Sequence, residues 1–230
     1  ALVNQLDYEG APAVRAVVRL GAGGRPESAE GSVVAGRVTA RDVPLEGASA
    51  RFAWSGTQVD VADIVLRTPH STAQGSYSMD TTSRAFRFLL DGELQPGDIN
   101  GWFREWWSQF WTNFDFSAEL PRASVEVAGR WGASMETTVF VAAAGENAGI
   151  RGVALDRIWT RLFVRPGYVD VLEFHARTHG RDAKGAFTRV GETGTGLLRE
   201  LEFDVTSELP AETAARLAGD AVVRALEPFT

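Results

Sequence analysis

The feature that most constrains this chain is an internal similarity with a constant spacing. The stretch VDVADIVLRTPHSTAQGSYS begins at Val59, and VDVLEFHARTHGRDAKGAFT begins 110 residues later at Val169. Aligned without gaps, the two share Val, Asp, Val, Arg, Thr, Ala and Gly at corresponding places. A long fixed period indicates that one folding unit is used more than once. The sequence therefore predicts two tandem repeats, residues 1–113 and residues 114–230.

The similarity extends beyond these stretches, with an offset that drifts by about five residues, as loop insertions would cause. Upstream, residues 6–8 correspond to residues 114–116, and residues 45–47 correspond to residues 150–152. The closing segment also resembles the opening of the chain and the join between the two copies. Both ends are expected to be cut from a longer array of repeats.

Within each copy the apolar residues alternate with polar ones, which is the period of a half-buried strand. Clusters of Gly, Ser, Thr and Asp supply turns at short spacing, as a meander of antiparallel strands requires. We therefore predict a mainly β fold: five or six strands per copy, forming a curved sheet or groove. Alternation should gather one set of side chains on a single concave surface: Phe52, Trp54, Val61, Phe86, Phe88, Leu90, Leu162, Val164, Val171, Leu201, Phe203 and Val205.

Each copy is predicted to close with an amphipathic helix. The first follows Asp98, a good N-cap, and covers residues 99–111; the second begins at Pro210 and covers residues 210–226. Four of the seven tryptophans lie between Trp102 and Trp111. An aromatic stripe of this kind most often packs on a core, so we expect one face of the first helix to close the apolar surface through Trp102, Phe103, Trp106, Trp107 and Phe110.

Composition excludes several function classes. Lys and Arg number 23 against 30 Asp and Glu, giving a net charge of -7, which argues against a nucleic-acid partner. Cysteine is absent, so thiolate metal sites and cysteine nucleophiles are excluded. Glu173, His175 and His179 are close in sequence but lack the spacing of a helical metal site. We expect no metal, no cofactor and no catalytic residues.

Two further motifs have structural explanations. The run GETGTG at residues 191–196 precedes a strand-like segment, so it is expected to be a hairpin loop instead of a phosphate loop, which needs a helix after it. The sequence WGASME around Ser134 lacks the final glycine of a nucleophile elbow. Neither motif indicates an enzyme.

The repeated pattern resembles a known family. VTARDVPLEGASARFAW, TQVDVADIVLRT and FRFLLDGELQP in the first copy, and GIRGVALDRIWTRLFVRPGYVDVLEFHARTHGRDAKGAFTRV in the second, are similar to the AsmA-like proteins of the bacterial envelope, relatives of TamB. The resemblance implies a long β-groove that shelters lipid acyl chains between the inner and outer membranes. It also implies a periplasmic segment of a parent protein anchored in the inner membrane, with further repeats as neighbours.

Two other classes of function stay open at this point. One is a structural or protein-interaction repeat module of the cell envelope, in which the helices seal each sheet. The other is a glycan-active enzyme that uses scattered carboxylates and tryptophans. Sugar-binding aromatic residues lie exposed beside polar partners, whereas here four of the tryptophans follow helical spacing, so the lipid-binding prediction comes first.

Overall fold

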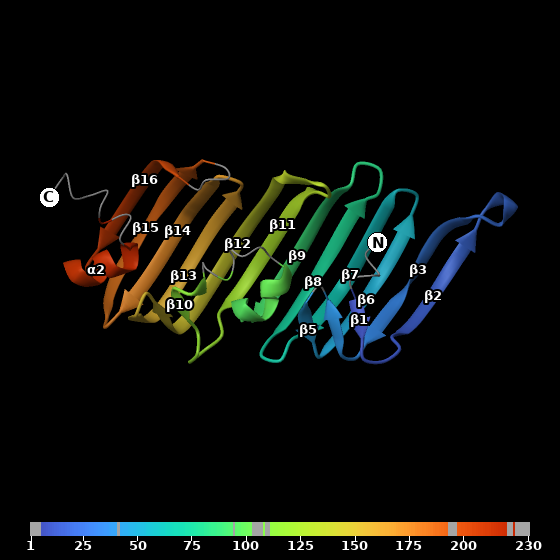
Figure 1. Ribbon diagram of the computed structural model, residues 1–230, viewed down its shortest axis with the longest axis horizontal. Coiled ribbons are helices and arrows are strands. Elements are labelled where there is room, and N and C mark those ends of the chain that lie inside the picture. The colour runs from blue at the N-terminus through green and yellow to red at the C-terminus, as the bar shows by residue number, and fades with distance from the viewer. Residues whose placement is uncertain are drawn as a thin grey trace.

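The described part of the chain is mainly β and forms one large antiparallel sheet (Figure 1). The computed structural model describes residues 6–40, 42–93, 95–102, 108, 111–192, 197–219 and 223. Along the sheet the strands are neighbours in chain order: β2 (Ala13–Leu20), β3 (Pro26–Ala35), β6 (Gly47–Ser55), β7 (Gln58–Arg67), β8 (Thr72–Asp80), β9 (Ala85–Glu93), β11 (Arg122–Arg130), β12 (Ala133–Ile150), β13 (Val153–Arg165), β14 (Tyr168–Thr178), β15 (Arg181–Gly191) and β16 (Leu198–Ser207).

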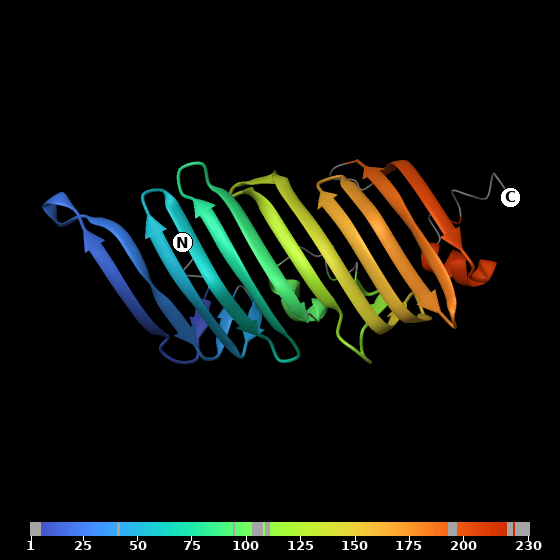
Figure 2. The ribbon, with the colours of Figure 1, turned by 180° about the vertical axis from the view of Figure 1, so that it is seen from behind.

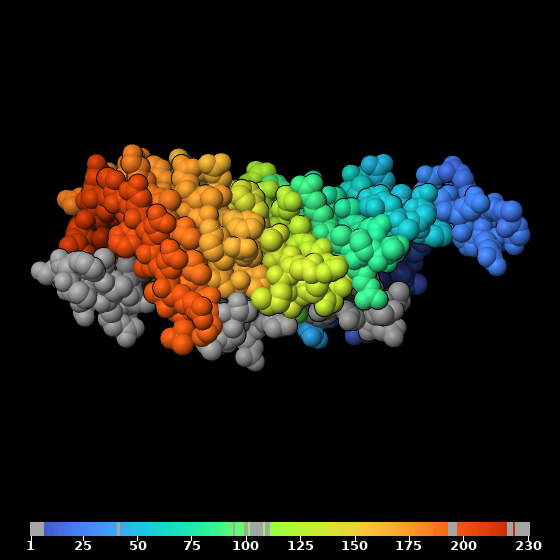
Figure 3. All heavy atoms as spheres, turned by 90° about the horizontal axis from the view of Figure 1, so that it is seen from above, coloured from blue at the N-terminus to red at the C-terminus, as the bar shows by residue number. Residues whose placement is uncertain are grey.

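Apart from the turn between β2 and β3, the shorter elements lie at one end of these strands, as the two opposite views show (Figures 1 and 2). A small sheet contains β1 (Leu6–Tyr8), β4 (Val38–Ala40) and β5 (Val43–Leu45), and β10 (Phe114–Asp115) pairs with β12. The described helices are the 3-10 turns η2 (Ala22–Gly24) and η3 (Pro96–Trp102) and the α-helix α2 (Ala211–Ala218). Seen from above, the colours run in chain order from one end of the molecule to the other (Figure 3).

The strand register divides the sheet into an apolar face and a polar face. Residues that oppose each other on neighbouring antiparallel strands point to the same side. Phe52 opposes Val61, Val61 opposes Tyr77, Tyr77 opposes Phe88, and Phe88 opposes Val127. The face that contains this row is the apolar face, and it continues across β12 to β16 through Val139, Val164, Val141, Leu162, Val171, Phe187 and Phe203.

The alternate residues form the polar face, which is rich in Arg, Glu, Asp, Ser and Thr. On β9 and β11, for example, Arg87 opposes Ala128, and Asp91 opposes Ser124. Period-two alternation in the sequence therefore becomes a sheet with one apolar and one polar side.

The pairing register of the first half of the sheet recurs in the second half. Val61 opposes Tyr77, and a bulge follows before Ile64 opposes Gly75. The residues 110 positions later, on β14 and β15, make the same two pairs with the same bulge between them. The pairs between β6 and β7 also recur at this spacing between β13 and β14, apart from the pair beside the bulge.

The small elements follow the same rule and correct one detail of the sequence alignment. Residues 6–8 pair with β4, and residues 114 and 115 pair with the end of β12. The predicted match of residues 45–47 to residues 150–152 is wrong. Leu45 opposes Val38, and the equivalent pair 110 residues later is Leu155 with Ala148. The similar residues at the two turns gave the wrong alignment, whereas the cross-strand pairs identify the residues that correspond.

The buried core lies where the short elements cover the apolar face. One cluster joins Val38, Val43 and Leu45 to Ala35, with Ala48 and Leu66 of the apolar face packed against it. A second cluster is centred on Ala73 and Leu90. A third contains Val153, Leu155 and Ala176, against which Ile158 of the apolar face and Leu217 of α2 pack. The first and third clusters hold equivalent positions in the two halves of the chain.

Most of the sheet has no second layer over it in the described structure. The chain exposes 14676 Å², whereas a typical monomer of this mass exposes about 10,200 Å². Two-layer packing normally buries the apolar side of a sheet. The excess surface is what a sheet one layer thick over much of its length would expose.

The predicted closing helices coincide only partly with the described elements. Residues 96–102 form a 3-10 helix, so Asp98 lies inside η3 and the prediction that it is the N-cap of a helix starting at residue 99 is wrong. Phe103, Trp106, Trp107 and Phe110, and the side chain of Trp102, lie outside the described residues. α2 ends at Ala218 and is followed by Gly219 at φ 81°; the rest of the predicted range 210–226, apart from residue 223, also lies outside the description.

Candidate functional site

All twelve residues predicted to share a surface lie on the apolar face. Leu90 and Val171 are buried at 6% exposure each. Phe203 and Val205, on the last strand, are exposed at 47% and 46%. The other eight, which lie on β6, β7, β9, β13 and β16, are half-buried. The candidate functional site is therefore this extended surface instead of a compact pocket.

The exposure of the apolar face changes along the strands. At one end, Leu66, Ala73 and Ala176 pack in or against the core clusters under the short elements. Towards the other end, Trp54, Phe86 and Val164 lie beyond those clusters and are half-buried. Half-buried aromatic and aliphatic side chains in a continuous row form an apolar patch of the kind that binds apolar partners.

An aromatic cluster lies at the open end of this face. The rings of Phe86 and Trp131 have centroids 5.0 Å apart, and Tyr77 stacks on Phe86 at 6.4 Å. The indole nitrogen of Trp131 donates a 2.8 Å hydrogen bond to the Tyr77 hydroxyl. Burial raises the pKa of Tyr77, and the hydrogen bond from Trp131 partly opposes that shift. Two polar groups thus meet at the edge of an otherwise apolar surface.

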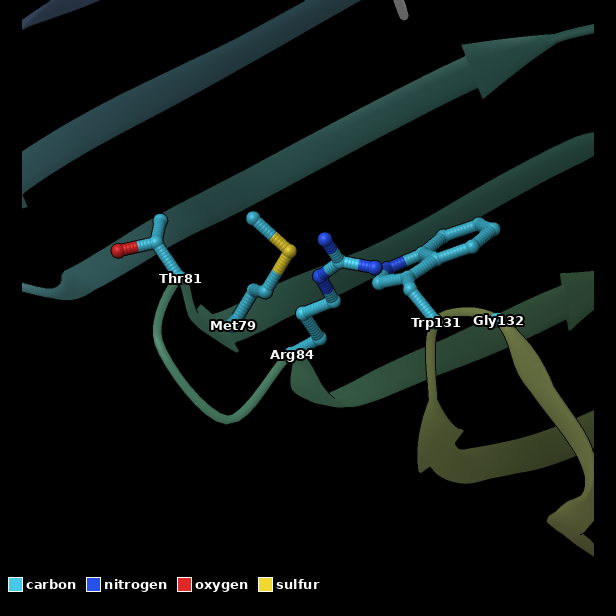
Figure 4. Close-up of a pocket in the computed structure, with 5 residues that line it drawn as sticks. All are labelled: Met79, Thr81, Arg84, Trp131 and Gly132. Atoms are coloured by element: carbon cyan, nitrogen blue, oxygen red, sulfur yellow. The ribbon is translucent and has the colours of Figure 1, made fainter.

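Beside this cluster lies a shallow hollow of ≈ 340 Å³, lined by Met79, Thr81, Arg84, Trp131 and Gly132 (Figure 4). The residues come from the β8–β9 turn region and from the turn between β11 and β12, so two hairpins form it. Sequence reasoning missed Trp131, which is 41% exposed. The only available signal was a tryptophan beside a turn glycine, and Gly132 indeed has φ 89°.

A second hollow, of ≈ 330 Å³, lies near the core end, between residues 95–97, 108, 111–112 and 114–117. The ring of Trp111 lies 4.9 Å from Phe114 and 6.0 Å from Phe116, centroid to centroid. The described part of the tryptophan-rich segment therefore contacts the chain around β10.

The polar face carries ion pairs between strands. Arg87 donates two hydrogen bonds to Glu126, of 2.7 and 2.9 Å, which lower the pKa of that carboxyl. Arg177 binds Asp182 in the same two-point manner, at 2.8 and 2.9 Å. These are solvated cross-strand pairs, and none of them brings an acid and a base together over a cavity.

His175 and Glu173 pair with neighbouring side chains of the sheet. His175 Nε2 lies 3.3 Å from Asp182 Oδ1, and Glu173 binds Arg161 at 2.7 Å. His179 lies in the turn after β14. Within the described ranges, no three His, Asp or Glu side chains come together as a metal site.

Asp98 has a different role from the one predicted. Its carboxylate accepts hydrogen bonds from Thr68 Oγ1 at 2.5 Å and Ser71 Oγ at 3.4 Å, and its Oδ1 lies 2.9 Å from His70 Nδ1. The Asp98 side chain is 11% exposed. The carboxylate therefore fastens η3 to the β7–β8 turn. The histidine does not lie between the hydroxyls and the carboxylate, as it would in a nucleophilic triad.

The glycine-rich run connects two adjacent antiparallel strands. Gly191 opposes Leu198, and Glu192 N donates to Leu197 O at 2.8 Å, on either side of residues 193–196, which lie outside the description. This connection is the hairpin expected from the sequence.

No helix in the described part of the chain is long and apolar enough to cross a bilayer. Comparisons with protein families, with curated proteins and with solved structures found no match to this chain.

Proposed function

We propose that this chain is a segment of an AsmA-like envelope protein whose apolar face forms a β-groove that shelters or conducts lipid acyl chains between membranes. The observation that carries the proposal is the continuous apolar face, which has a cover only at one end in the described structure. A sheet of this kind needs a partner for its apolar side. Acyl chains supply one, because each buried CH₂ contributes about 0.8 kcal/mol.

The chemistry of the face fits a lipid better than a polar substrate. Its members are almost all aliphatic or aromatic, and the polar groups near it, such as Tyr77 and Trp131, pair with each other at the open end. Acyl chains need no hydrogen-bonding groups for recognition. This accounts for a large apolar surface whose described residues include no acid, base or metal cluster, and the proposed role is non-enzymatic.

The repeat organisation is part of the proposal. We infer that residues 1–113 and 114–230 are two copies of one unit, placed side by side in one sheet. The recurring strand register, the bulges at equivalent places and the equivalent core clusters support this division. In each unit the segment after the last strand, residues 99–111 or 210–226, closes the apolar face. Leu217 of α2, which packs on the third cluster, supports that role for the second unit.

The proposed setting follows from the lipid-handling role. The parent protein is anchored in the inner membrane, and this segment lies in the periplasm. The polar face of the sheet, with its Arg–Glu and Arg–Asp pairs, suits an aqueous compartment.

Native mass spectrometry of the purified chain tests the proposal by detecting co-purified phospholipid. The variant Phe88→Asp places a charge on the apolar face, and we expect it to stay folded and to lose bound lipid. Leu89→Asp is the matched control, because Leu89 is the next residue on β9, points to the polar face and is 36% exposed. That control should keep its lipid.

Three results distinguish the alternatives. Loss of lipid from Phe88→Asp alone supports the groove. Equal lipid content in both variants and in the unmutated chain would place the lipid elsewhere and refute the assignment of the face. If Phe88→Asp unfolds while Leu89→Asp does not, the face is a closed core. Phe203→Asp, on the exposed last strand, then provides a second variant whose lipid content can be measured, because a charge at an exposed position does not unfold the chain.

A non-enzymatic structural or protein-interaction module of the cell envelope is the second candidate. In the described structure β2 and β16 each have one edge without a partner strand. This favours the second candidate, because exposed strand edges bind other chains. If the unmutated chain carries no lipid in any preparation, this candidate is favoured over the first.

A further inference from the structure

The two ends of the sheet are strands with one edge unpaired in the described structure. β2 pairs only with β3, and β16 pairs only with β15. Both end strands also expose large apolar side chains: Val14 at 57% and Val18 at 50% on β2, and Phe203 and Val205 at 47% and 46% on β16. Exposed edge strands of this kind are templates for pairing with another chain.

The sheet already contains a junction that shows how two such edges fit. β9 is the last large strand of the first half, β11 is the first of the second half, and the two pair antiparallel. On the apolar face of this junction, Phe88 opposes Val127 and Leu90 opposes Val125. The strands joined here are the counterparts of the two free edges.

The pairing registers fix these counterparts residue by residue. β16 pairs with β15 as β9 pairs with β8, with each β16 residue 115 positions after its β9 counterpart. β11 pairs with β12 as β2 pairs with β3, with each β11 residue 109 positions after its β2 counterpart. Phe88 and Val127 therefore correspond to Phe203 and Val18.

Transferred to the free edges, the junction register places apolar residues opposite apolar residues. Phe203 would oppose Val18, and Val205 would oppose Ala16. On the polar face, Glu202 would oppose Arg19, and Asp204 would oppose Val17. The β2 edge carries Arg15 and Arg19 on this face, with Arg19 3.3 Å from Glu30 of β3. The β16 edge carries Glu200, Glu202 and Asp204. The two edges are therefore complementary in charge as well as in register.

We propose that β16 of one copy of this chain pairs antiparallel with β2 of a second copy, in the register of the internal β9–β11 junction. The free edges lie at opposite ends of the sheet (Figure 1), roughly 50 Å apart at about 4.8 Å per strand, so one chain does not close on itself. The contact is head-to-tail and generates an open series in which the apolar faces are continuous. This inference does not rest on lipid binding.

Cysteine cross-linking tests the register, because the chain has no cysteine of its own. In the double variant Val17→Cys/Asp204→Cys, the two thiols face each other across the proposed junction. Mild oxidation of the concentrated full chain should give a ladder of disulfide-linked dimers, trimers and larger species. Val17→Cys/Glu200→Cys is the control, since its thiols are four residues out of register and on the same face. That control should give at least tenfold less ladder at equal concentration, because cross-strand disulfides require Cβ atoms about 4 Å apart.

Charge reversal tests the same contact without a covalent bond. Glu202→Arg should weaken the concentration-dependent association measured by sedimentation velocity roughly fivefold, since it puts like charges opposite each other. Arg19→Glu should do the same, and the double variant Arg19→Glu/Glu202→Arg should restore association.

Several outcomes would overturn the proposal. Equal ladders from both cysteine pairs would mean that the register is absent. Dimers from the single-cysteine variants, with no larger species from the double variant, would mean that like edges pair with like. Association that ignores both charge reversals would point to contact through the apolar faces instead. A chain that stays monomeric at all concentrations would exclude the contact.

Discussion

Gly75 on β8 offers a sharp test of the sheet geometry, because its position leaves no room for a side chain. A Cβ added there would lie 2.1 Å from the backbone oxygen of Leu89 on the neighbouring strand. The bulge in β7 lies just before the Ile64–Gly75 pair, and glycine within a strand often marks such a close approach of backbones. Gly75→Ala therefore forces β8 and β9 apart, because a carbonyl oxygen cannot rotate away as a flexible side chain can.

Two opposing effects set the size of the loss. Alanine is favoured over glycine in a strand by roughly 0.5–1 kcal/mol, because it loses less conformational entropy on folding. Overpacking costs about 1–3 kcal/mol. Since the clash is with backbone, the second effect should dominate, and we expect a net loss of about 2 kcal/mol. For a chain of this size that lowers Tm by roughly 4–8 °C.

Thermal denaturation followed by circular dichroism measures this change. Gly185→Ala should behave similarly, because its Cβ would lie 2.2 Å from the Asp204 oxygen at the equivalent place on β15 and β16. Gly36→Ala is the control, since a Cβ there meets nothing within 4 Å, and its Tm should be unchanged or slightly higher. If Gly75→Ala has the same Tm as the unmutated chain, the close approach of β8 and β9 is not present in solution.

Two further predictions concern polar groups that hold turns in place. Asp98→Ala removes the acceptor for the buried Thr68 hydroxyl and for Ser71, so we expect chemical denaturation to give a loss of roughly 1–3 kcal/mol; an unchanged unfolding midpoint would show that η3 is not fastened through this carboxylate. At the β8–β9 turn, hydrogen bonds from Thr57 and Ser83 lower the pKa of Asp80 to about 2 from 3.8. A carboxyl whose pKa is lowered by folding stabilises the folded state above pH 3.8 and loses that contribution as the pH falls towards 2. The pH dependence of Tm between pH 4 and 2 should therefore be shallower in Asp80→Asn, and an identical profile would contradict the turn geometry.

Alternation in the sequence by itself predicted the mainly β fold and the membership of the apolar face. A side chain's face depends only on its parity along a strand, which is local information. All twelve predicted residues therefore share one face, although β7 and β14 contain bulges that shift the parity partway along. The bulges did not disturb the prediction, because Val61 and Val171 precede them and the remaining predicted residues lie on other strands.

The tertiary structure decided how the strands combine and what covers them. The pairing of β9 with β11 joins the two halves into one sheet. The local sequence of either strand does not predict which strand it pairs with, because pairing depends on contacts between distant residues. Asp is a residue type that is common at N-caps, so local sequence favoured that role for Asp98. In the structure its carboxylate instead binds Thr68 and Ser71 of the β7–β8 turn, which are distant in sequence. Trp131 likewise gains its partners, Tyr77 and Phe86, only when two hairpins lie side by side. Sequence period fixes which side of a strand is apolar, whereas the layer that covers that side depends on where distant segments of the chain come to lie.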